Sequence, residues 1–137
     1  AAAIVVQAIM CIHFAVRLWR LEVAVRYGPL VYALGIPLAA ISLWLWRVGA
    51  MPAFWIGGVL YLVWAAFGYT VEYALGLQDW REPVRWTILV PYVLLYLVTM
   101  MFYWWPLGLI CKPLWYAAGA LFVAGSVVNG LSHRSNA

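Results

Sequence analysis

Four hydroxyl-bearing side chains recur at helical spacing in the uncharged run from residue 86 to residue 111. Their spacing of i, i+4, i+7 and i+11 places them on one face of a helix. In an apolar environment each hydroxyl needs a partner, so we expect this face to point at other helices or at a cavity. Interhelical hydrogen bonding is the simpler interpretation, and a ligand pocket is the alternative. The four residues are Tyr92, Tyr96, Thr99 and Tyr103.

A matching face is predicted for the run from residue 48 to residue 71 and the carboxyl group that follows it. Its members lie within about 100° of each other on a helix, and its small residues let another helix approach. Glu72 could carry protons, because burial disfavours the charged form of a carboxyl. We favour the simpler expectation that Glu72 lies at the membrane surface and pairs with Arg81 or Arg85. The members are Gly57, Tyr61, Trp64, Ala65, Gly68 and Glu72.

His13 and Arg17 lie one helical turn apart in the first apolar run. An imidazole there could bind haem iron or relay protons, but the only second histidine is His133, in the polar tail. The simpler expectation is that His13 hydrogen-bonds a neighbouring helix and that Arg17 extends to lipid phosphate. Asn129, in the last apolar run, is expected to hydrogen-bond across a seam of small residues.

Catalytic motifs are absent from the sequence. There is no G-x-S-x-G, no H-E-x-x-H, no P-loop and no Gly-rich dinucleotide fingerprint. Cys11 and Cys111 lack metal-ligand spacing and should face opposite sides of the membrane, so we expect neither a metal site nor a disulfide. The sequence favours a protein without catalytic activity and identifies no cofactor.

The composition indicates that a lipid bilayer surrounds these elements. Hydrophobic residues make up 69% of the 137 residues and charged residues 9%, whereas soluble domains have roughly 45–50% and 25%. A small fold in water could not bury so much apolar surface. The net charge of +4 comes from basic residues scattered between apolar runs, which argues against nucleic acid as a partner.

We predict one all-α integral membrane domain, a compact bundle of five transmembrane helices. A helix needs about 20 apolar residues to cross a bilayer, and the expected spans are about 1–18, 27–46, 53–74, 86–105 and 113–132. Residues 17–26 are expected to form the first connection. The first run is a turn short, so four spans plus an interfacial or partial helix is the alternative. Pro37 should bend the second span, because it leaves the carbonyl of Ala33 without a donor.

The basic residues are divided unequally between the two expected membrane faces. The second and fourth connections hold Arg47 and Lys112, whereas the first and third connections and the tail hold six basic residues. The positive-inside rule therefore predicts a multi-pass protein with its N-terminus outside and its C-terminus in the cytoplasm. The six residues are Arg17, Arg20, Arg26, Arg81, Arg85 and Arg134.

With five expected spans and ten Trp residues, the chain resembles in composition the tryptophan-rich sensory protein/translocator family, whose members bind porphyrins and sterols. That family's Trp- and Pro-rich loop motif has no counterpart here, so no site residue is carried over. The Pro91–Tyr92 stretch is similar to emopamil-binding-type membrane proteins, whose acidic residues also lack clear counterparts.

Three functions remain open. The chain could be a non-catalytic subunit within a larger membrane assembly, with other membrane subunits or further copies of itself as partners. It could bind or carry a lipophilic molecule such as a lipid, quinone, sterol or tetrapyrrole in an aromatic-lined pocket. It could also be a small proton-coupled transporter that uses Glu72. We favour the first, because the loops are short and several helices carry seams of small residues.

Overall fold

The computed structural model describes residues 2–77 and 85–132, and all the regular elements in these ranges are helices. Five stretches are long and apolar enough to cross a membrane, the first included. The all-α prediction is thereby confirmed. The elements are α1 (Ala2–Trp19), α2 (Leu21–Ala33), α3 (Gly35–Arg47), α4 (Pro52–Tyr69), the π-helix η1 (Thr70–Ala74), α5 (Trp86–Trp104), the 3-10 helix η2 (Trp105–Leu109) and α6 (Lys112–Ser132).

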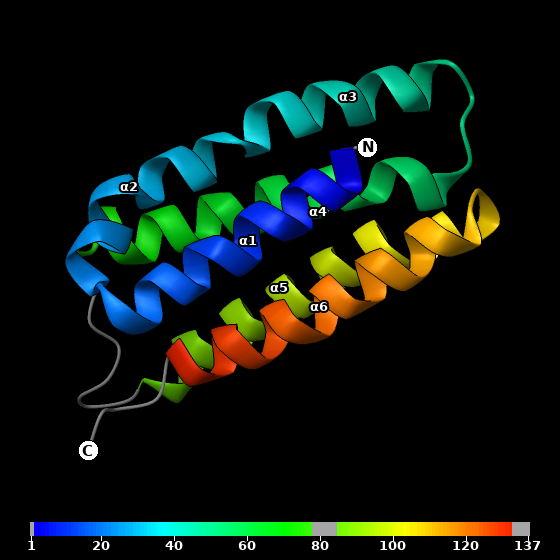
Figure 1. Cartoon of the computed structure of the whole chain (residues 1–137). Helices are drawn as coiled ribbons and strands as arrows, with labels where there is room; N and C mark the ends of the chain where they lie inside the picture. Colours follow the sequence, from blue (N-terminus) through cyan, green and yellow to red (C-terminus); the bar gives the residue numbers. More distant parts are fainter. Residues whose placement is uncertain (1, 78–84, 133–137) are drawn as a thin grey trace.

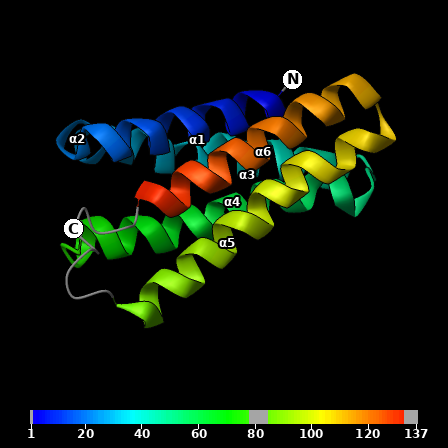
Figure 2. The same ribbon diagram turned by 60° about the horizontal axis from the view of Figure 1, so that its bottom comes forward.

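The helical spans lie side by side and alternate in direction, with α2 and α3 following each other along one path (Figures 1 and 2). Helix α1 packs mainly against α6 and α2, and α4 lies between α3 and α5. We call the end at which α1 and α6 finish the Glu72 end, and the end that carries η2 the Trp105 end.

The first connection is much shorter than predicted. Helices α1 and α2 are separated by Arg20 alone, whose backbone (φ −141°, ψ 77°) turns the chain. The prediction of a connection over residues 17–26 was therefore wrong: Arg17 belongs to α1, and Glu22 and Arg26 belong to α2. Long charged side chains can extend from a helix end toward water, so a cluster of charges does not require a loop.

The second span is interrupted at Leu34, between α2 and α3. Pro37 follows three residues later, and without an N–H it cannot donate to the carbonyl of Ala33. The interruption lies where this missing donor predicted a bend. Two other turn signals are also observed: Gly49 has a positive φ of 73° in the turn before α4, and Pro52 occupies the first turn of α4.

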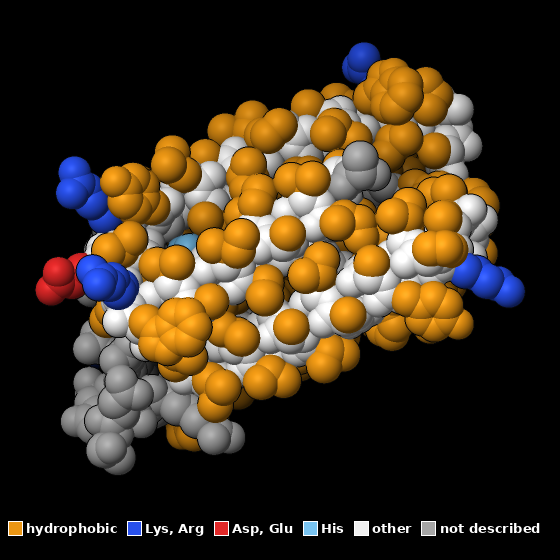
Figure 3. Space-filling model, viewed as in Figure 1, with side chains coloured by type: hydrophobic (Ala, Val, Ile, Leu, Met, Phe, Trp, Pro, Cys, Tyr) orange, Lys and Arg blue, Asp and Glu red, His pale blue; other side chains and the backbone are white. Residues whose placement is uncertain are grey.

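Hydrophobic side chains cover the middle of the molecule, and the Lys and Arg side chains of the visible face lie at its two ends (Figure 3). Large aromatic side chains are exposed toward the ends as well, among them Trp19, Trp86 and Trp105. A broad apolar band with basic and aromatic residues at its edges is typical of a bundle that spans a membrane.

Candidate functional site

Glu72 is positioned by a change of helix type at the end of α4. The backbone N–H of Leu75 donates to the carbonyl of Thr70 (2.9 Å), an i to i+5 bond that belongs to the π-helical turn Thr70–Ala74. The Thr70 hydroxyl donates to the carbonyl of Ala66 (2.8 Å), a side-chain bond that often bends a helix. Within this turn Glu72 is buried, with 2% of its surface exposed.

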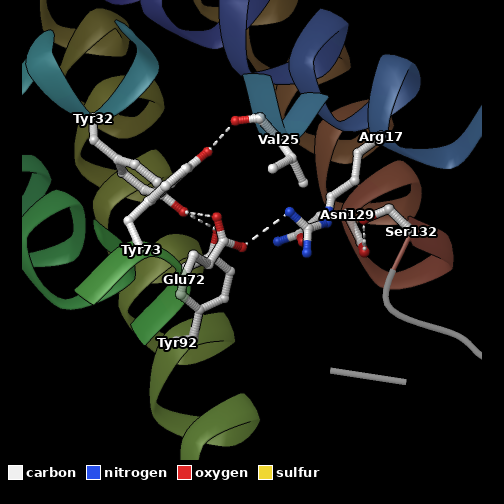
Figure 4. A network of polar contacts seen from close by, with 8 residues as sticks. All are labelled: Arg17, Val25, Tyr32, Glu72, Tyr73, Tyr92, Asn129 and Ser132. Atoms are coloured by element: carbon white, nitrogen blue, oxygen red, sulfur yellow. Dashed lines mark hydrogen bonds and ion pairs between the residues drawn. The ribbon is translucent and has the colours of Figure 1, made fainter. Parts of the chain in front are cut away.

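The Glu72 carboxylate is held by a cation and a phenol (Figure 4). Arg17 Nη1 of α1 lies 2.9 Å from Glu72 Oε1, and both side chains are buried. The Tyr32 hydroxyl of α2 donates to Glu72 Oε2 at 2.9 Å. Since the Tyr32 proton points at Glu72, the Tyr92 hydroxyl is the donor in the 3.4 Å contact between the two phenols. The site therefore joins α1, α2, α5 and the π turn.

One expectation about these charges was wrong: Arg17 does not extend to lipid phosphate but is enclosed and paired with Glu72. Glu72 is enclosed as well, and its expected position at the membrane surface stays a prediction. Each buried charge stabilises the other, and neither could remain in the apolar interior alone. Of the two expected partners, Arg85 is exposed at the start of α5 and Arg81 lies outside the described residues.

A second tyrosine of the π turn satisfies a backbone group that a proline leaves free. Pro29 lies inside α2 and has no N–H to donate to the carbonyl of Val25. The Tyr73 hydroxyl donates to that carbonyl. Gly28 makes room for this contact, because a Cβ at Gly28 would collide with the Tyr73 hydroxyl. The π turn is thus attached to α2 on two sides, through Tyr32 and through Tyr73.

The two helix faces predicted from residue spacing, which we call the α4 stripe and the α5 stripe, meet in the interior of the bundle. Trp64 of α4 is fully buried, and its ring lies 5.5 Å from that of Tyr92 and 6.1 Å from that of Tyr96 on α5, measured between centroids. Tyr61 donates to the carbonyl of Val31 (2.8 Å), and its ring lies 6.4 Å from that of Tyr103. The stripes therefore pack directly on each other.

Several interior polar atoms have no hydrogen-bond partner among the described residues. They include Trp64 Nε1, Thr99 Oγ1 and the Tyr103 hydroxyl. Thr99 is fully buried and Tyr103 is half-buried. The interior thus contains polar atoms whose hydrogen-bonding capacity is not used within the described residues.

Asn129 and Ser132 of α6 lie at the Arg17 side of the cluster (Figure 4). Asn129 is buried, and its backbone carbonyl accepts a hydrogen bond from the Ser132 hydroxyl (2.8 Å). Its side-chain oxygen Oδ1 has no partner within residues 2–77 and 85–132, so the expected hydrogen bond across the seam is not made by this atom.

His13 does not form the expected hydrogen bond to a neighbouring helix in the described part of the chain; its ring makes an edge contact with Phe14 at 5.4 Å. The second histidine, His133, lies outside the described residues. Within the ranges that the structure describes, no three His, Cys, Asp or Glu side chains come together as they would to bind a metal ion.

Sequence reasoning missed two residues that contact or support the site. Tyr32 contacts Glu72, and Tyr73 holds the π turn. The signal for Tyr32 was helical spacing with small residues: Ala24, Gly28 and Tyr32 follow one another at i+4, and all are buried.

The fold and the site define a helical bundle with five apolar spans and an enclosed carboxylate–guanidinium pair. Comparisons of the chain with family models, with curated proteins and with solved structures give no match. Neither the tryptophan content nor the Pro91–Tyr92 stretch therefore places the chain in a family. Chemically, the site could hold a fixed charge pair, or it could release the pair by protonation of Glu72.

Proposed function

We propose that the chain is a non-catalytic subunit that crosses the bilayer five times and packs within a larger membrane assembly. Its reactive side chains support this role, because they are used in contacts with one another. Glu72 is paired with Arg17, and Tyr92 and Tyr96 pack against Trp64. A ligand between the two stripes would have to displace these ring contacts.

The single observation that carries the proposal is the outward face of α6. This span is the least buried of the five, with 22% of its membrane window buried. Ala120 and Ala124, one turn apart on α6, line an apolar groove together with Trp115 of the same helix and Trp104 at the end of α5. Small residues four apart let a second transmembrane helix approach closely. The occupant we propose is a transmembrane helix of a partner subunit.

The groove has a rigid wall, which suits a permanent contact. The Trp104 ring stacks on that of Trp115 at 5.3 Å, and Trp104 Nε1 donates to the Trp115 carbonyl at 3.1 Å. A wall already ordered before binding has little side-chain entropy to lose when a helix packs against it.

Native mass spectrometry of the protein, extracted gently from its own membrane, tests the proposal. We expect release together with other polypeptides at a fixed stoichiometry. Replacing Ala120 and Ala124 by Leu should abolish this co-release, because the larger side chains fill the groove. Ala40→Leu is the matched control: it makes the same change at an exposed position of α3 outside this groove. A bare wild-type monomer would overturn the proposal.

A proton-coupled transporter that uses Glu72 is the second candidate. The observation that favours it is the π-helical turn around a buried carboxylate, because such turns occur frequently at functional sites. Protonation of Glu72 would remove its attraction to Arg17 and free α1 from the π turn. An ionisable group at membrane depth is a common element of proton pathways.

A further inference from the structure

A shallow groove of about 250 Å³ runs between α1 and α2 near the Glu72 end and is separate from the α6 groove. Its walls are apolar except for Tyr27 and the imidazole of His13. Helix α1 contributes Ile9, Ile12, His13 and Val16, and α2 contributes Val23, Ala24, Tyr27 and Val31.

His13 is a buried polar group without a hydrogen-bond partner in the described ranges. It is 8% exposed, and the exposed part borders the groove. A neutral imidazole has one N–H donor and one acceptor nitrogen, and leaving them unpaired in an apolar environment is costly.

A cation lies at the rim of the same groove. The Arg26 guanidinium is exposed and lies 5.8 Å from the centre of the Tyr27 ring, which forms part of the groove wall. The neighbouring exposed charges are Arg20 and Glu22, so the three sum to one positive charge. Arg17, one turn beyond His13, is directed at Glu72.

We propose that this groove binds one anionic phospholipid of the surrounding bilayer. An acyl chain would lie along the apolar walls, and the His13 N–H would donate to an ester carbonyl oxygen. The phosphate-bearing headgroup would lie at Arg26. A groove that opens sideways to lipid, with a donor inside and a cation at its rim, matches the order of tail, ester and phosphate in such a lipid.

The test is native mass spectrometry of the full chain in a neutral detergent with an equimolar mixture of phosphatidylglycerol and phosphatidylcholine of identical acyl chains. We expect one retained phosphatidylglycerol in preference to phosphatidylcholine. Arg26→Ala should lower that preference about fivefold, the effect of one basic residue near anionic lipid. Arg47→Ala, at the Trp105 end, is the matched control and should leave the preference unchanged.

The groove variants separate the ester contact from the charge contact. His13→Leu should lower retention of both lipids and leave their ratio unchanged, because both carry ester carbonyls. His13→Gln keeps a donor and should restore part of the retention. Val23→Trp should fill the groove and displace both lipids, whereas Leu43→Trp, exposed on α3 outside it, should not.

Thermal unfolding followed by circular dichroism verifies that each variant is folded before its lipids are counted. Equal adducts of the two lipids on the wild-type chain would overturn the proposal. So would equal losses of preference in Arg26→Ala and Arg47→Ala, since binding would then follow overall charge instead of this groove.

Discussion

At the scale of single residues, the Arg17–Glu72 pair lies where the surrounding helices exclude water. Removing two charges from water costs several kcal/mol for each ion, and their attraction repays this only with good geometry and further hydrogen bonds. The 2.9 Å contact brings the two charges together, and the Tyr32 hydroxyl adds a hydrogen bond to Glu72 Oε2. We therefore expect that removing one of the two charges destabilises the fold more than removing both.

This dependence predicts a strongly non-additive mutant cycle. Arg17→Met leaves a buried carboxylate unpaired and should lower the free energy of unfolding by about 3–5 kcal/mol. Glu72→Gln leaves a buried guanidinium and should also be strongly destabilising. The double variant should lose less than either single variant. Denaturant titration of the purified protein, followed by circular dichroism, measures the cycle, and additive losses would show that the two groups do not interact in the fold.

The same substitution distinguishes the two candidate functions at this residue. In sealed proteoliposomes that contain a pH-sensitive dye, a proton carrier should acidify the lumen under an imposed membrane potential, and Glu72→Gln should stop this flux. A structural pair predicts that wild-type and Glu72→Gln vesicles acidify at the same background rate. The vesicles are compared at equal amounts of folded protein, so loss of stability does not imitate loss of flux.

At the scale of the helices, glycines set how closely α3 approaches α4. A Cβ at Gly58 would collide with the Ser42 hydroxyl and lie 2.5 Å from the backbone carbonyl oxygen of Leu38. A backbone atom cannot move aside as the end of a flexible side chain can. The α3–α4 contact therefore requires a residue without a side chain at position 58.

We expect Gly58→Ala to lower the free energy of unfolding by about 1–3 kcal/mol, the usual cost of overpacking. Gly130→Ala is the matched control, because a Cβ there meets nothing within 4 Å and Ala is the better helix former. Thermal unfolding of both variants in one detergent measures the difference. Equal melting temperatures would show that α3 and α4 are not packed as closely as described.

At the scale of the whole molecule, the positions of the charges decide which membrane face is cytoplasmic. Arg17 is neutralised by Glu72, so it adds little to the positive charge of the Glu72 end. Arg20, Arg26 and Arg85 are exposed there, against Arg47 and Lys112 at the Trp105 end. Arg81 and Arg134 lie outside the described residues. Both still count in the sequence, so setting Arg17 aside leaves five basic residues against two for the predicted orientation.

The Glu72 end should still face the cytoplasm, because basic residues near span ends are retained on that side. In a bacterial inner membrane, green fluorescent protein fused after residue 137 should fluoresce. Alkaline phosphatase inserted after Gly49, in the α3–α4 turn, should be active. As controls, green fluorescent protein inserted after Gly49 should not fluoresce, and alkaline phosphatase fused after residue 137 should be inactive. The reverse pattern would show that the orientation is inverted.

The sequence by itself determined the helical class, the five apolar spans and the buried faces of α4 and α5. These properties depend on composition and on a period of 3.6 residues, both of which are local. Tyr61, Trp64, Tyr92 and Tyr96 are buried as that period predicted. Pro37 likewise marked the interruption of the second span, because the backbone restriction of proline acts within a few residues.

Only the tertiary structure decided which of these faces meet and what the charges contact. Periodicity puts Glu72 on an inward face, but its partners Arg17 and Tyr32 are 55 and 40 positions away in the sequence and come from other helices. Periodicity also could not show that His13 borders a groove instead of forming a hydrogen bond to a neighbouring helix. Pairings between distant helices depend on how whole side-chain surfaces fit together, and no local pattern encodes that fit.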